Sequence, residues 1–356
     1  MHKVSVILPL YNADIRCLGD CIKSIQAQTL SDFECIFVND GSPMQECIEY
    51  AVSRTRDDDR FKLVEKTNGG LASARNFGFR HSKGDYITFV DQDDILHPQW
   101  LELAVKTMET ASADVCECKV LRPSFKAVFK AKSYPFYEPT EVLNTANLLK
   151  GADILKWYLA QKMNITVWSH VYRRQIIEGH PLPECVWGSD DLAYNIVNAN
   201  RIKSLVKICQ PLYFWRRNPK ATTGRVPCAY MEGVVQAIEY VKSYYRAHTL
   251  SEEMEQSLKL YLSCTFTDVM RDVLQVKRND AECVGLVGLA KKTNFLLDGG
   301  VIDDVDAEDK CWMQKLMDGN FQMATSLAKT VFAKRERRKK LMQIKRFVKR
   351  IVGRKQ

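Results

Sequence analysis

The first 95 residues alternate between apolar runs of strand length and segments with helical spacing, and this pattern is the strongest constraint on the fold. Runs rich in β-branched residues at 4–10, 33–38, 61–65 and 85–90 predict strands. Gly, Asn or Asp follows each run. Such alternation is typical of a doubly wound α/β sheet with helices on its faces. Because ligands bind outside the carboxyl ends of strands in these sheets, the polar residues there are the first candidates for a site.

The last of these runs ends in FVDQDD, which contains Asp91, Asp93 and Asp94. Three carboxylates close together raise one another's pKa unless a positive charge lies between them. Asp91 and Asp93 point to the same side of an extended chain. Oxygen ligands of this kind suit a hard divalent cation such as Mg²⁺, completed by water and substrate phosphates. On these residues alone, an Asp-rich turn ahead of Pro98 explains the segment equally well.

Two other strand ends carry groups suited to a nucleotide. Asp40, in VNDGS, can accept a hydrogen bond from a nucleobase or a ribose, although Asp-Gly-Ser also makes an ordinary turn. In NGGLASARN, Gly69 and Gly70 permit close approach of the backbone, and the following helix offers free N–H groups to phosphate. Arg75 adds a positive charge to this site or braces an aspartate of FVDQDD. The alternative is a helix packed on the sheet with Arg75 at the surface.

The motifs VSVILPLYN, VNDGS, NGGLASARNFG and FVDQDD resemble, in order and spacing, those of the family-2 inverting glycosyltransferases of the GT-A fold that build bacterial surface polysaccharides. Three later segments are similar to further motifs of this family: VWSHVYRR at 167–174, WGSDDLAYN at 187–195 and YFWRRNPKATTG at 213–224. The resemblance covers about residues 1–225. It implies a GT-A sheet, doubly wound and mixed, flanked by helices.

The resemblance also implies roles for individual residues. Asp40 would bind the nucleotide, with uracil as its base, Asp91 would contact the ribose side, and Asp93 would bind a divalent metal, Mn²⁺ or Mg²⁺, that assists departure of the diphosphate. Asp191 or its neighbour Asp190 would take the proton from the acceptor hydroxyl. One displacement with one base inverts the anomeric carbon. The other residues expected to bind the donor are Pro9, Tyr11, Asn12, Gly70, Arg75 and Arg217.

Three positions depart from the family pattern. The family's Glu-Asp pair is Asp190–Asp191 here, which gives two candidates for the base, and Asp191 is preferred by its position. Asn39 stands where Asp is frequent. His170 replaces the usual Lys, which predicts altered contacts with acceptor or phosphate. Without the other motifs, the Asp pair would be interpreted as acids that stabilise a helix N-terminus.

The positive charge of the chain is concentrated in its last segment. Residues 334–356 hold twelve Lys and Arg against one acid, so this segment carries +11 and the rest of the chain sums to −2. Apolar residues recur every three or four positions and predict an amphipathic helix on an anionic membrane surface. A nucleic-acid-binding tail is less favoured, because phosphate binding needs no apolar stripe. A helix that packs on the domain or on a partner is the other alternative. The stripe consists of Leu341, Ile344, Phe347, Val348, Ile351 and Val352.

These observations predict three regions: a catalytic domain at 1–225, a helical region at 226–333 and the basic amphipathic tail at 334–356. No run reaches the roughly 20 apolar residues of a transmembrane helix, and no export signal or CxxC pair is found. We therefore expect a cytoplasmic enzyme, peripheral on the inner face of the cytoplasmic membrane. The expected donor is a UDP-sugar that supplies a hexose or N-acetylhexosamine, and the expected acceptor is a lipid-linked saccharide. No nucleic acid is expected as a partner.

Two further functions fit parts of the sequence. A nucleotidyltransferase also uses an α/β fold, metal and phosphates, but it would need a Gly- and Lys-rich loop after the first strand, where LYNAD stands. A non-catalytic nucleotide-sugar-binding or scaffold module would have no need of the aspartates. An NAD-linked dehydrogenase is remote, because no GxGxxG follows the first strand.

Overall fold

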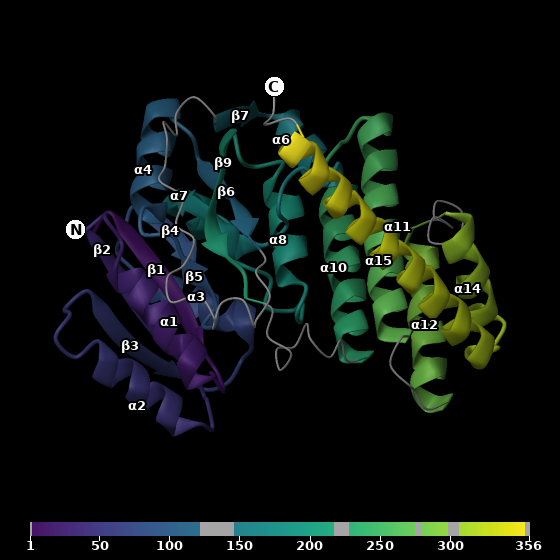
Figure 1. Ribbon diagram of the computed structural model, residues 1–356, viewed down its shortest axis with the longest axis horizontal. Helices are drawn as coiled ribbons and strands as arrows, with labels where there is room; N and C mark the ends of the chain where they lie inside the picture. The colour runs from purple at the N-terminus through teal and green to yellow at the C-terminus, as the bar shows by residue number, and fades with distance from the viewer. Residues whose placement is uncertain (1, 122–145, 217–227, 275–279, 298–305, 353–356) are drawn as a thin grey trace. The chain divides into compact units, whose positions relative to one another are not determined.

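The chain forms two compact units, Met1–Arg225 with Ser243–Ala247, and Val226–Lys242 with His248–Gln356. A computed structural model describes both units (Figure 1). Beyond 337 only the backbone of the last helix is described. The described residues are 2–121, 146–216, 228–274, 280–297 and 306–352.

The first unit is built on a nine-stranded sheet in the order β3-β2-β1-β4-β8-β6-β9-β5, with β7 paired to β9. Strands β3, β2, β1 and β4 are parallel, as are β6 and β9, while β8, β5 and β7 pair antiparallel to their neighbours. The expected doubly wound, mixed sheet is confirmed. The strands are β1 Val4–Leu10, β2 Phe33–Asp40, β3 Phe61–Lys66, β4 Tyr86–Phe89, β5 Ile95–Leu96, β6 Val115–Leu121, β7 Ala146–Lys150, β8 His170–Arg173 and β9 Ser204–Phe214.

Helices cover both faces of this sheet (Figure 1). Val6 and Leu8 of β1 join the core that includes Leu18 of α1. Ile7 points to the other face, toward α3, where a Cβ at Gly78 would lie 2.5 Å from its side chain. Since β1 is buried on both faces, its sequence is a continuous apolar run. The helices are α1 Ile15–Gln26, α2 Gln45–Arg54, α3 Leu71–His81, α4 Trp100–Ala111, α6 Ala152–Leu159, the 3₁₀ turn η2 Val167–Ser169, α7 Arg174–Glu178 and α8 Asp190–Asn198.

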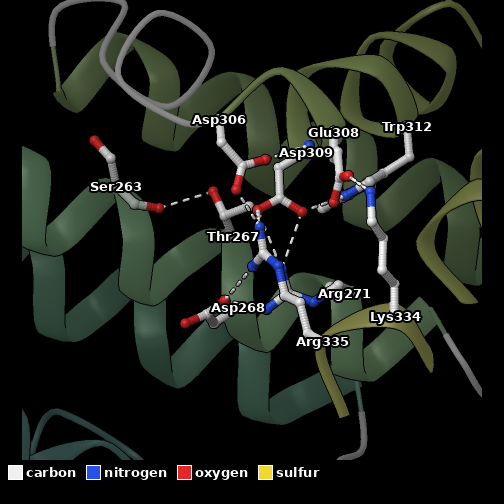
Figure 2. A network of polar contacts seen from close by, with 10 residues as sticks. All are labelled: Ser263, Thr267, Asp268, Arg271, Asp306, Glu308, Asp309, Trp312, Lys334 and Arg335. Carbon is white, nitrogen blue, oxygen red and sulfur yellow. Dashed lines mark hydrogen bonds and ion pairs between the residues drawn. The ribbon is translucent and has the colours of Figure 1, made fainter. Parts of the chain in front are cut away.

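The second unit is helical in its described part, and a buried carboxylate joins three of its helices (Figure 2). Asp309 of α14 is 4% exposed. It accepts hydrogen bonds from Arg271 of α11 at 2.9 Å, Trp312 of α14 at 2.8 Å and Arg335 of α15 at 2.8 Å. Its charge is thus balanced by two arginines. The helices are α10 Cys228–Arg246, α11 Glu252–Leu274, α12 Asp280–Leu296, α14 Ala307–Met317 and α15 Phe321–Val352.

Helix α15 continues through residue 334, where the basic tail was expected to begin as a separate region. Lys334 pairs with Glu308, and Arg335 pairs with Asp309 (Figure 2). The first two basic residues of the tail therefore belong to the folded helical unit. In the part of the chain that the structure describes, no helix combines the length and apolarity required to cross a membrane.

Candidate active site

The loops that follow β1, β2 and β4 are tied together at one edge of the sheet, where these parallel strands end. Gln92 exchanges two hydrogen bonds with the backbone of Tyr11, at 3.0 and 2.9 Å. Asn12 has a φ of +49°, and its N–H donates to Oγ of Ser42 at 3.0 Å. The backbone of Tyr11 is thus fixed while the residue stays 44% exposed. Pro9, also expected to bind the donor, is buried within β1.

Asp40 shapes the loop between β3 and α3. Its carboxylate accepts the N–H of Gly69 at 3.0 Å, the N–H of Gly70 at 2.9 Å and the Lys66 ammonium at 2.8 Å. Gly70 has a φ of +85°, a conformation that favours glycine, and leads directly into α3. Since Asp40 is 3% exposed and bonded within the protein, its expected contact with a nucleobase stays a prediction.

Arg75 of α3 is the cation among the aspartates. Its Nη1 donates to Asp190 at 3.0 Å and to Asp191 at 2.6 Å, and its Nη2 donates to Asp91 at 2.9 Å. The side chain is 1% exposed. Of the two roles that the sequence suggests, it therefore has that of a brace, and it brings together acids from two motifs far apart in the chain. A direct contact between Arg75 and a donor remains a prediction.

The two acids at the start of α8 differ in their exposure. The side chain of Asp191 is 20% exposed and that of Asp190 only 4%. Burial raises the pKa of Asp191 to about 7; Asp190 and Asp91 act in the same direction, and Arg75 opposes them. A general base works best when its pKa lies near the working pH and solvent or substrate can reach it. Asp191 fits these requirements better than Asp190.

Asp94 has a structural role at this edge. Its side chain is buried and accepts hydrogen bonds from the Tyr213 hydroxyl at 2.9 Å and from the Arg216 N–H at 2.8 Å. The Tyr213 oxygen in turn accepts the N–H of Asp91 at 3.3 Å. Burial, reinforced by the charges of Asp93 and Asp91, raises the pKa of Asp94 well above its usual range. Asp94 therefore fastens the end of β9 to the turn after β4.

A divalent metal at Asp93 would need ligands from outside the protein. Among the described residues, no group of three or more His, Cys, Asp or Glu side chains is arranged to hold a metal ion. Asp93 lies half-buried between Asp91 and Asp94 in the chain, and its charge adds to the burial that raises the pKa of Asp94. Mg²⁺ is commonly held by one or two carboxylates together with water and substrate phosphates. The acids present fit a metal bound in that way.

His170 lies inside the sheet, contrary to the altered acceptor or phosphate contacts expected of it. It is fully buried, with Nδ1 2.7 Å from the Thr166 carbonyl oxygen and Nε2 3.0 Å from the Tyr158 hydroxyl. Burial lowers the pKa of His170 to about 3, so the ring is neutral at pH 7. The sequence motif singled this residue out, but it could not show that the side chain points into the core.

A buried carboxylate, that of Glu117, lies beside His170. Glu117 of β6 is fully buried, and its Oε1 pairs with Lys207 at 3.0 Å and accepts from Asn164 at 3.0 Å. Its Oε2 is 3.9 Å from Nε2 of His170. Burial raises the pKa of Glu117 to about 7, and Lys207 opposes this shift. This group titrates near neutrality inside the sheet.

Sequence reasoning missed two amide side chains that hold the site together. Gln92 lies inside FVDQDD, a motif in which only the aspartates were assigned roles. Asn76 follows Arg75 in NGGLASARN. Asn76 donates to the Leu182 carbonyl oxygen at 2.9 Å. The amide side chain itself was the available signal: Asn and Gln can both donate and accept hydrogen bonds, so an amide inside a motif can link two loops. Arg217, expected to bind the donor, lies outside the described residues.

Comparison with known proteins agrees with this architecture. Residues 5–179 match the family model described as Glycosyl transferase family 2. The uncharacterized glycosyltransferase EpsJ of Bacillus subtilis (strain 168) is 29% identical over 270 residues, which are 73% of this chain and 74% of EpsJ. The uncharacterized glycosyltransferase YibD of Escherichia coli (strain K12) is 32% identical over 180 residues, 49% of this chain and 50% of YibD.

The fold is also that of a solved structure. S. aureus TarS 1-349 in complex with UDP-GlcNAc superimposes with a TM-score of 0.67 over 93% of this chain and 92% of that one, at 16% sequence identity. At this identity the likeness concerns the fold alone. The mixed sheet, the ordered motifs and the match to the family model lead to one conclusion: residues 5–179 form a glycosyl transferase family 2 domain, and the chain has the GT-A fold.

Proposed function

We propose that this chain is an inverting glycosyltransferase that moves a hexose or N-acetylhexosamine from a UDP-sugar to a hydroxyl of a saccharide acceptor. The observation that carries the proposal is the position of Arg75. Its guanidinium joins Asp91, at the end of β4, to Asp190 and Asp191, at the start of α8. Donor-side and acceptor-side acids thus meet at one point, as a displacement at a single carbon requires.

The donor would lie along the edge where β1, β2 and β4 end. The loop shaped by Asp40 leads into α3, whose first backbone N–H groups would face the diphosphate, and the exposed Tyr11 lies at the same edge. Asp91 would face the ribose. Asp93 would hold Mn²⁺ or Mg²⁺, which supplies positive charge for the departing nucleoside diphosphate.

Asp191 would act as the general base. Its carboxylate takes the proton of the acceptor hydroxyl while that oxygen forms a bond to the anomeric carbon. The bond from this carbon to the diphosphate oxygen breaks, and its electron pair leaves with UDP. Because one nucleophile replaces one leaving group from the opposite side, the configuration inverts. Arg75 keeps Asp191 oriented and limits the repulsion among the acids.

The acceptor and the membrane belong to the same proposal. We assign the basic, amphipathic part of α15 to an anionic membrane surface, where each Lys or Arg contributes about 1 kcal/mol. An enzyme held at such a surface is suited to a lipid-linked saccharide, as in the synthesis of capsule, exopolysaccharide or O-antigen. A cytoplasmic, peripheral location follows from this assignment.

A thermal-shift titration tests the donor site. Wild type, Asp93→Asn and the control Asp57→Asn, on an exposed turn, are titrated with UDP, GDP and a panel of UDP-sugars, with and without Mn²⁺. A ligand of the folded state raises the melting temperature with its concentration. We expect UDP to stabilise wild type and the control only with metal, and Asp93→Asn to lose the shift. If no nucleotide stabilises wild type with metal present, the chain is a non-catalytic module instead.

A further inference from the structure

Two consecutive residues of α3 hold the two ends of the segment 182–191. Asn76 exchanges hydrogen bonds with the backbone of Leu182, at 2.9 and 3.0 Å, and donates to Glu184 at 2.8 Å. Arg75 holds Asp190 and Asp191 at the other end. A loop tied to one helix at both ends by buried groups has little freedom to move relative to that helix.

Trp187 lies in the middle of this segment and is 45% exposed. Trp187 is the most exposed of the six tryptophans in the chain, all of which the structure describes. Gly188 follows with a φ of +70°, so the chain turns sharply between Trp187 and the N-terminus of α8. An indole that is partly exposed on a fixed loop can offer an apolar face to a ligand that reaches the start of α8.

We propose that Trp187 is the platform on which a pyranose ring of the acceptor saccharide packs. The proposal rests on the function proposed above, in particular on Asp191 as the base. Asp191 follows Trp187 by four positions, so their Cα atoms are at most about 14 Å apart. A sugar ring presents an apolar C–H face, which gains by covering an indole, and polar edges that remain hydrated. The base and the platform then belong to one loop.

This assignment separates acceptor from donor recognition. The groups assigned to the donor come from the loops after β1, β2, β3 and β4, whereas Trp187 lies on the chain that leads into α8. Loss of the indole should therefore weaken binding of the saccharide and leave binding of UDP unchanged. Because Asn76 and Arg75 hold both ends of the segment, removal of the Trp187 side chain should also leave the position of Asp191 unchanged.

The test compares wild type, Trp187→Ala, Trp187→Phe and the control Val52→Ala, which alters a similarly exposed apolar residue on α2. Saturation-transfer NMR with methyl glycosides of glucose, galactose and N-acetylglucosamine, in the presence of UDP and Mn²⁺, reports saccharide binding. We expect the best glycoside to bind wild type and Val52→Ala equally, Trp187→Ala at least 10-fold more weakly, and Trp187→Phe in between. In the thermal-shift assay, UDP should stabilise all four proteins equally.

Two outcomes overturn the inference. One is that Trp187→Ala binds the glycosides as wild type does; the other is that wild type binds none of them although UDP binds. A Trp187→Ala protein that loses UDP binding as well would make the residue a part of the donor site or of the fold. Failure of UDP to bind wild type is a different result, because it removes the proposed function itself.

Discussion

Nη1 of Arg75 donates a 2.6 Å hydrogen bond to Oδ1 of Asp191, although the two residues are 116 positions apart in the chain. The same guanidinium contacts Asp190 and Asp91. The positive charge that the acids of FVDQDD require is therefore supplied in part by the protein itself. This contact also fixes where α8 begins relative to the end of β4.

Removal of this cation should destabilise the first unit strongly and in a pH-dependent way. Arg75→Met leaves three carboxylates near one another without a buried partner, and we expect a loss of about 3–5 kcal/mol at pH 8. The loss should be smaller at pH 5, because protonation relieves the repulsion. Urea unfolding at both pH values measures this, with the exposed Arg80→Met as control. An equal loss at pH 5 and pH 8 would contradict the role of Arg75 as a brace of ionised acids.

The two acids at the start of α8 should differ in their effect on transfer. We expect Asp191→Asn to lower kcat by at least about 100-fold, the usual contribution of a general base, and Asp190→Asn to lower it less. In wild type, kcat/KM should rise with pH through about 7, since the pKa of Asp191 lies there and the base must be ionised. Steady-state rates between pH 5.5 and 9 provide the measurement. A larger loss in Asp190→Asn would reverse the assignment.

Glu117 should make the stability of the first unit fall as pH rises. Burial raises its pKa from 4.5 to about 7, so the folded state holds a proton that the unfolded state releases. The stabilisation is complete below pH 4.5 and is lost as pH rises through 7, an effect of roughly 3 kcal/mol. Relative to Glu117→Gln, which stays neutral, wild type should lose stability between pH 5 and pH 8. If the difference in unfolding free energy between wild type and Glu117→Gln is the same at pH 5 and pH 8, Glu117 does not titrate in this range.

The basic end of α15 should bind anionic vesicles independently of the folded helical unit. A truncation after Arg337 keeps Lys334 and Arg335 in their ion pairs and should unfold in urea as wild type does. It should no longer sediment with phosphatidylglycerol vesicles, and wild type should not sediment with phosphatidylcholine alone.

A matched variant separates lipid from nucleic acid as the partner of this segment. The double substitution Ile344→Ser and Phe347→Ser preserves every charge and interrupts the apolar stripe. We expect it to lose most of the vesicle binding, because the apolar face inserts at the interface. If the double variant binds vesicles as wild type does, the binding depends on charge alone. If wild type binds duplex DNA more tightly than vesicles, the partner of this segment is nucleic acid and not lipid.

Much of the fold could be predicted because its signals are local. The continuous apolar run of β1 reflects burial on both faces, and the Gly and Asp residues after the strands mark the edge where the candidate site lies. The order of the motifs was specific enough to indicate the family. The two-residue strand β5 was not predicted, because Ile95 and Leu96 are too few to give a periodic signal.

The mixed α/β sheet, the edge that carries the polar residues and the candidate acids could all be inferred from the order of residues. How those residues are used follows from contacts that form only in the folded protein. Folding buried His170, bonded Asp40 to its own loop and placed Arg75 between Asp91 and the acids of α8. Backbone periodicity is written into neighbouring residues, whereas the partner of a charged side chain is set by elements that meet only after folding. For that reason the motifs predicted the members of the site but not its internal contacts.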